Sequence, residues 1–186
     1  MPAGLAHPRP PLADGVICLE PLDERFIPDF EQLATDPDVR RFTRVPVEPD
    51  AGFAAAWVNR YVTGWADASR AGFAIVSGEG EFLGLAALVD LDLPARQGEI
   101  GYIVKPSARG RGVAGRALGL VAQWALGPFG LARVELRIST GNEASQRVAE
   151  RLGFARDGVL RSVHLKDDVR EDVAVYSLLR GELPAE

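Results

Sequence analysis

The stretch from Glu99 to Phe154 constrains the fold of this chain more than any other, because strand and helix patterns follow one another there with short connections. Alternating apolar residues in Glu99–Val104 and Arg133–Ile138 predict two strands. Apolar spacing after the first strand predicts a helix that stops at Gly127–Pro128. A second, shorter helix opens within Thr140–Ser145 and ends at Gly153. The stretch therefore predicts the order strand, loop, helix, strand, helix.

The loop between the first strand and the first helix is rich in glycine and arginine, and reads Arg109-Gly-Arg-Gly-Val-Ala-Gly-Arg116. A junction of this kind presents unpaired backbone N–H groups and the positive end of a helix dipole to an anion. Its three arginines add full positive charge to that partial charge. The loop predicts a phosphate or pyrophosphate site.

The glycines from Gly110 to Gly115 also fit the dinucleotide-binding string G-x-G-x-x-G, with Glu135 about 20 residues further on. Three features argue against that reading. Lys105–Arg109 separates the strand from the first glycine, where a dinucleotide fold turns tightly. Glu135 falls inside its strand, and hairpins rather than βαβ units flank the stretch. No Gly-Lys-Ser/Thr follows, so the loop is not a nucleoside-triphosphate P-loop either.

The rest of the chain mixes strands and helices in one unit. The expected helices and irregular pieces are a helix from Asp23 to about Ala34, a breaker at Thr35–Asp38, an irregular piece Val39–Arg44 and a helix from Pro49–Asp50 to about Ala68. The expected strands are Val16–Leu22, the hairpin Phe73–Val76 with Phe82–Val89, and the terminal hairpin Val159–Leu165 with Val169–Leu179. This order predicts an α+β fold rather than a regular βαβα alternation.

Composition bounds the protein's class and surroundings. With 186 residues, we expect a flexible tail over 1–14 and one domain over 15–182. No apolar run approaches the roughly 18 residues of a membrane span, so we expect no membrane partner. The single Cys18 gives no disulfide framework and no metal cluster, and a cytoplasmic location is the default expectation. A net charge of −5 argues against a nucleic-acid partner.

Several spaced motifs carry a resemblance to a known family. The Arg109–Gly115 loop after Ile103-Val104 resembles the acetyl-CoA pyrophosphate loop of the GNAT N-acetyltransferases. Further motifs resemble the RimJ/RimL-type branch, namely Leu131–Arg137, Asn142–Ser145, Leu152–Phe154, Gly158–Arg161 and Tyr176–Leu179 with Asp172. The resemblance implies a GNAT fold, with a mostly antiparallel central sheet of about seven strands flanked by helices.

The resemblance also implies how acetyl-CoA would be bound as co-substrate, without a metal. The backbone of Ile103 and Val104 would hold the pantetheine arm, and the Val104 N–H would face the thioester oxygen, where charge develops. The pyrophosphate would be wrapped by Arg109, Gly110, Arg111, Gly112, Ala114, Gly115 and Arg116.

Two catalytic candidates follow from the same resemblance. Asn142 would contact the cofactor arm, and Ser145, one turn further on, would protonate the leaving thiolate. Many GNAT members use a tyrosine four residues further on for that step, but this chain has Ala149 there. Glu99 is the candidate base, acting through water, and a solvated strand-end carboxylate is an equal alternative.

The sequence says least about the acceptor of the acetyl group. Phe42, Thr43 and Arg44 lie where related proteins line the acceptor site. Trp57, Tyr61 and Trp65 fit a helix core, and Tyr102 fits a packing role. The resemblance favours a protein N-terminal α-amine as acceptor. A small-molecule amine (an antibiotic or a polyamine), a longer acyl-CoA donor and a non-catalytic CoA-binding regulatory module stay open, and family members often form homodimers.

Overall fold

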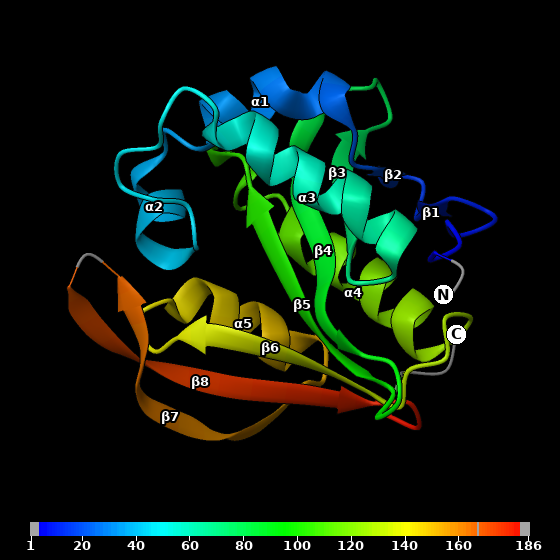
Figure 1. Ribbon diagram of the computed structural model, residues 1–186. Coiled ribbons are helices and arrows are strands. Elements are labelled where there is room, and N and C mark those ends of the chain that lie inside the picture. The colour runs from blue at the N-terminus through cyan, green and yellow to red at the C-terminus, as the bar shows by residue number, and fades with distance from the viewer. Residues whose placement is uncertain (1–3, 167, 183–186) are drawn as a thin grey trace.

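An eight-stranded sheet, in the order β1-β2-β3-β4-β5-β6-β8-β7, forms the centre of the protein in this computed structural model (Figure 1). The structure describes residues 4–166 and 168–182. The strands are β1 (Leu12–Ala13), β2 (Ile17–Pro21), β3 (Ala71–Ser77), β4 (Phe82–Asp92), β5 (Gln97–Val104), β6 (Arg133–Ser139), β7 (Ala155–Lys166) and β8 (Val169–Leu179). All neighbours pair antiparallel except β5 and β6, which confirms the expected α+β architecture with a mostly antiparallel sheet.

The extra strand relative to the expected sheet is β1, which lies inside the segment 1–14. Leu12 pairs with Leu19 of β2, and the Leu5 N–H donates to the Trp65 carbonyl at 2.7 Å. A two-residue strand is too short to show the alternation by which strands are recognised in a sequence. Part of the expected tail therefore lies against the sheet edge and a neighbouring helix.

Helices cover both faces of the sheet (Figure 1). The 3₁₀ turn η1 (Glu24–Phe26), α1 (Ile27–Leu33) and α3 (Phe53–Asp67) lie on one face, and their apolar side chains pack with Ala74, Val76 and Leu85. The other face packs against α4 (Val113–Leu126) and the smaller α5 (Glu143–Arg151). Trp57, Tyr61 and Trp65 of α3 are buried, as their helical spacing predicts.

One helix contradicts the sequence reading. Thr35–Asp38 and Val39–Arg44 were expected to be a breaker and an irregular piece, but residues Pro37–Phe42 form α2. Asp36 caps this helix by accepting the Val39 N–H at 3.0 Å, and proline occupies the first helical position. The expectation was wrong because a proline at that position lacks only an N–H that the helix would leave unpaired anyway.

The pairing of β5 with β6 is brief. It covers Gln97↔Arg133, Gly98↔Val134 and Glu99↔Glu135, and the two strands then diverge, as Figure 1 shows. On its other side β5 stays paired with β4 as far as Val104, and the Lys105 N–H donates to the Leu83 carbonyl at 2.8 Å. Because bonded residues alternate along an antiparallel strand, the backbone groups of Ile103 face β4, and those of Tyr102 and Val104 face the opening.

Candidate active site

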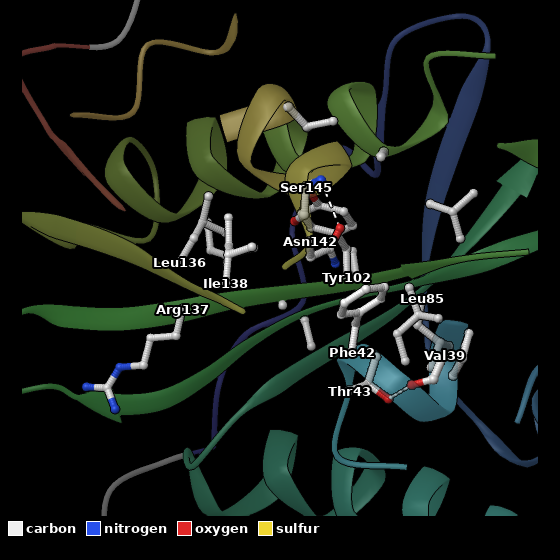
Figure 2. A pocket seen from close by; sticks show the side chains of 18 of the residues that line it. Val39, Phe42, Thr43, Leu85, Tyr102, Leu136, Arg137, Ile138, Asn142 and Ser145 are labelled. Atoms are coloured by element: carbon white, nitrogen blue, oxygen red, sulfur yellow. Dashed lines mark hydrogen bonds between the residues drawn. The ribbon is translucent and has the colours of Figure 1, made fainter. Parts of the chain in front are cut away.

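A cavity of about 900 Å³ lies where β5 and β6 diverge. Its walls come from β4, β5 and β6, from α2 and α3, from the loop before α4 and from the start of α5. Figure 2 shows side chains of these walls, with Tyr102, Asn142 and Ser145 in one group and with Phe42 and Thr43 across the cavity. The sequence motifs of the strand, the loop and the second helix therefore meet at one place.

Tyr102 and Ser145 form a hydroxyl pair inside this cavity. The Tyr102 Oη lies 2.8 Å from the Ser145 Oγ, and the Asn142 Oδ1 accepts the Ser145 backbone N–H at 3.1 Å (Figure 2). Asn142 thus caps α5 and fixes the residue that carries the hydroxyl. Burial raises the pKa of the Tyr102 phenol, so Tyr102 stays a proton donor at neutral pH. Sequence reasoning assigned Tyr102 to packing and missed this contact.

Glu99 is a buried carboxylate rather than a solvated strand end. Its side chain is 14% exposed, and its Oε2 is buried without a hydrogen-bond partner among the described residues. The Arg137 Nε lies 3.8 Å from that oxygen. Burial raises the pKa of Glu99 to about 7, with smaller opposing effects of Arg44 and Asp90. A carboxylate with this pKa can exchange a proton near neutral pH.

Glu99 and Tyr102 lie on opposite faces of β5. Ile100 and Val104 belong to the core with α4, and Tyr102 packs against it. Ile103 packs against the core formed with α1 and α3. Since side chains alternate along a strand, Glu99 shares the α3 face with Ile103, and Tyr102 faces α4 and α5. The Glu99 carboxylate and the hydroxyl pair therefore lie on opposite sides of β5.

The glycine loop offers its backbone to the cavity. Gly110 and Gly112 have φ values of +73° and +80°, and a Cβ added at either would meet nothing within 4 Å. The lining includes Arg109, Gly110, Gly112, Ala114 and Gly115, the last two in the first turn of α4, but not Arg111 or Arg116. The cavity therefore meets open backbone at the start of a helix, which suits an anion.

Two arginines of the loop, which the sequence predicted to bind pyrophosphate, pair with carboxylates of the protein itself. Arg109 pairs with Asp36 at 2.5 Å and Asp38 at 3.0 Å, and its Nε donates to the Val104 carbonyl at 3.1 Å. Arg116 pairs with Asp14 at 2.7 Å. The guanidinium of Arg109 thus ties α2 to the end of β5.

The three acceptor candidates all line the cavity, but they differ in freedom. The Thr43 hydroxyl donates to the Val39 carbonyl at 2.6 Å and accepts the Val45 N–H at 3.1 Å, so it has a local structural use. Arg44 is 67% exposed and lies 3.6 Å from Asp90. The Lys166 Nζ donates to the carbonyls of Thr43 and Val45, both at 2.7 Å, which fixes this segment to β7.

Comparison with protein families explains the arrangement. The family model described as "Acetyltransferase (GNAT) domain" matches residues 17–155. The chain belongs to the GNAT acetyltransferase family. The GNAT match includes the glycine loop, both diverging strands and α5, and thus the whole opening between β5 and β6.

The individual GNAT relatives share about a third of their aligned residues with this chain, or fewer. YdaF of Bacillus subtilis, provisionally named a ribosomal N-acetyltransferase, is 32% identical over 58% of this chain and 59% of its own length. The spermidine N(1)-acetyltransferase of Escherichia coli K12 is 30% identical over 46% of each chain. The chain thus spans about half the length of these two curated relatives. RimL, a ribosomal L7/L12 alpha-N-protein acetyltransferase solved with coenzyme A, shares the fold at TM-score 0.82 and 18% identity, covering 91% of this chain and 96% of that one.

The described residues also give information on metal sites and on membrane-spanning helices. Within 4–166 and 168–182, no group of three or more His, Cys, Asp or Glu side chains is placed to hold a metal ion. None of the helices described for this chain is long and apolar enough to cross a membrane.

Proposed function

We propose that this chain transfers an acetyl group from acetyl-CoA to a primary amine by direct attack, and that the acceptor is a protein N-terminal α-amine. The observation that carries the proposal is the placement of Glu99 and of the Tyr102–Ser145 pair on opposite faces of β5, in the cavity where β5 leaves β6. A base on one side of a reacting centre and an acid on the other suit acyl transfer.

The residues present fit acetyl-CoA, which supplies an acetyl group activated as a thioester. Gly110 and Gly112 leave the backbone open where the pyrophosphate would lie, next to the start of α4. The backbone of Val104 faces the opening, so its N–H is the proposed donor to the thioester oxygen. Tyr102 shares that direction, and the paired Ile103 does not, which moves the expected backbone contacts from Ile103 to Tyr102.

The chemistry assigned to the side chains balances in protons and electrons. The acceptor nitrogen forms the new C–N bond with its lone pair and loses one proton toward Glu99, through water. The C–S bond breaks with its electron pair on sulfur, and the Ser145 hydroxyl gives that sulfur a proton. The Tyr102 Oη lies 2.8 Å from the Ser145 Oγ, and with Tyr102 as the donor the Ser145 proton is directed at the sulfur. The Tyr102 proton then replaces the one that Ser145 gives away, and solvent, which takes up the proton released by Glu99, restores the Tyr102 hydroxyl.

The pKa of Glu99 bears on the choice of acceptor. An N-terminal amine has a pKa of about 8, and a lysine amine has one of about 10.4. A carboxylate with a pKa of about 7 suffices for the first and is a poor match for the second. The likeness to a spermidine N(1)-acetyltransferase supports a polyamine as the second candidate acceptor.

Thiol release from acetyl-CoA, measured with a panel of amines, tests the proposal. The panel contains peptides with free N-termini, the same peptides with blocked N-termini, and spermidine. We expect turnover with free N-termini and none with blocked ones. Turnover with spermidine alone would favour the polyamine reading. Binding of CoA without turnover on any amine would indicate a non-catalytic module, and faster turnover with longer acyl-CoA would change the donor.

A further inference from the structure

We propose that the acceptor carries an anionic group, of carboxylate type, close to its reactive amine, and that Arg44, Arg60 and Arg70 hold that group. This inference rests on the proposed function, because it concerns the acceptor of the same reaction. It separates the acceptor from polyamines, which carry only positive charge.

Three arginines from separate segments act electrostatically on the Tyr61 phenol, at the α3 side of the cavity. Arg44 follows α2, Arg60 lies on α3, and Arg70 lies just before β3, and all three line the cavity. The Arg60 Cζ lies 4.5 Å from the centre of the Trp57 ring, and the Arg70 Cζ lies 6.0 Å from that of Tyr61. The flat aromatic rings hold the guanidiniums in place.

Two of these guanidiniums form no close ion pair within the described residues, and Asp67 acts on Arg70 only from a longer distance. Across residues 4–166 and 168–182, no carboxylate lies within 4.0 Å of Arg60 or Arg70. Asp90 is the partner of Arg44, at the long distance of 3.6 Å. Elsewhere in this protein, arginines near carboxylates form close pairs, such as Arg109 with Asp36. The planar guanidinium fork matches a carboxylate, so an anion from the acceptor would complete these side chains.

Arg44 links the three arginines to the group assigned to the amine, because its charge acts both on Glu99 and, with those of Arg60 and Arg70, on Tyr61. Val89 pairs with Glu99 across β4 and β5, and Asp90, the partner of Arg44, follows Val89 directly. Glu99 also faces α3, the helix that carries Arg60 and Tyr61. An acceptor whose amine approaches Glu99 therefore brings its neighbouring groups to the arginines. A second positive charge on the acceptor, close to these arginines, would be repelled.

Three C-terminally labelled peptides test this directly. They share an N-terminal serine and differ in the next two residues, which are acidic, the matching amides, or lysines. We expect kcat/KM for the acidic peptide to exceed that for the amide peptide by about tenfold and to fall as salt is added. Free amino acids with a side-chain carboxylate, in a separate arm, distinguish a small acceptor from a peptide.

Variants of the arginines show which side chains cause the preference for the acidic peptide. Arg60→Gln and Arg70→Gln should each lower kcat/KM for the acidic peptide by about threefold to tenfold and leave the amide peptide within about twofold. Arg156→Gln, an exposed residue of β7 outside the cavity, is the matched control and should change neither. Equal rates on all three peptides, or a preference for the lysine peptide, would overturn the inference and leave the proposed function standing.

Binding gives a readout that does not depend on turnover. With CoA present, fluorescence polarisation should show tighter binding of the acidic peptide than of the amide peptide, and Arg60→Gln should remove the difference. If no amine is acetylated, the proposed function fails, and this measurement still decides whether the arginines bind an anion. Equal polarisation curves for the two peptides would contradict the inference.

Discussion

The Tyr102 hydroxyl lies 2.8 Å from the Ser145 hydroxyl, although 43 residues separate the two in the chain. One is carried by the strand that diverges and the other by the first turn of the helix that follows the next strand. Each hydroxyl has one proton, so only one of the two can donate to the other. If Tyr102 donates, the Ser145 proton is left for the departing sulfur.

Ser145→Ala should therefore slow turnover without weakening cofactor binding. The backbone N–H that Asn142 caps is kept, so α5 stays in place. We expect kcat to fall by about 100-fold, the usual size of a lost proton donor, with the Kd for CoA within about twofold. Steady-state kinetics and calorimetry check this, and an unchanged kcat would remove Ser145 from the mechanism.

Tyr102→Phe tests whether the tyrosine acts through Ser145. Removing only the hydroxyl should lower kcat by about tenfold, which corresponds to about 1.4 kcal/mol. The double variant with Ser145→Ala should be no slower than Ser145→Ala alone, because the two groups act as a unit. If the double variant instead lost kcat by the product of the two single losses, Tyr102 would act independently of Ser145.

Glu99 makes stability depend on pH. Its pKa is about 7 in the folded protein and about 4.5 when unfolded, so folding favours the protonated form. This contribution is fully present below the unfolded pKa and is lost as the pH rises through about 7, by about 3 kcal/mol in total. Glu99→Gln should lack the decline between about pH 5 and pH 8, measured by urea unfolding. An identical decline in both proteins would contradict the assignment.

The Glu99 carboxylate should also make kcat/KM depend on pH. With an acceptor whose amine is neutral throughout the range, kcat/KM should rise with pH and level off above about 7. Glu99→Gln should be slower and should lack that rise. A wild-type profile that stays flat across neutral pH would exclude Glu99 as the base.

Gly112→Glu tests the glycine loop. The new side chain adds strain at a φ of +80° and puts a negative charge where the pyrophosphate would bind, so we expect CoA affinity to fall by at least about 100-fold. Gly80→Glu is a matched control, since Gly80 has a φ of +85°, lies in the turn between β3 and β4, and is equally open. CoA affinity should be unchanged in Gly80→Glu, and similar losses in both variants would point to strain alone.

The sequence predicted the elements that depend on local pattern and missed what depends on distant contacts. The strands and helices from Glu99 to Phe154 were confirmed because their alternation and spacing are regular. The helix Pro37–Phe42 was missed because a proline after an aspartate reads equally well as a turn or as a capped helix start.

The candidate site shows the same division. The sequence brought Ser145, Glu99 and the loop glycines forward, and the structure places all of them around one cavity. It could not show that Arg109 meets Asp36 and Asp38, which lie 73 and 71 residues away. Nor could it show the partner of Tyr102, because alternation along a strand says which face a residue occupies and not what it touches there.

The most direct test of the account is to follow a labelled acetyl group from acetyl-CoA to a peptide amine by mass spectrometry, in single turnovers of the wild-type protein. Direct transfer predicts label on the N-terminal amine at the rate of thiol release, with no labelled protein at any time and a matching slow rate in Ser145→Ala. Label that passes through the protein, or CoA binding with no labelled acceptor, would contradict it.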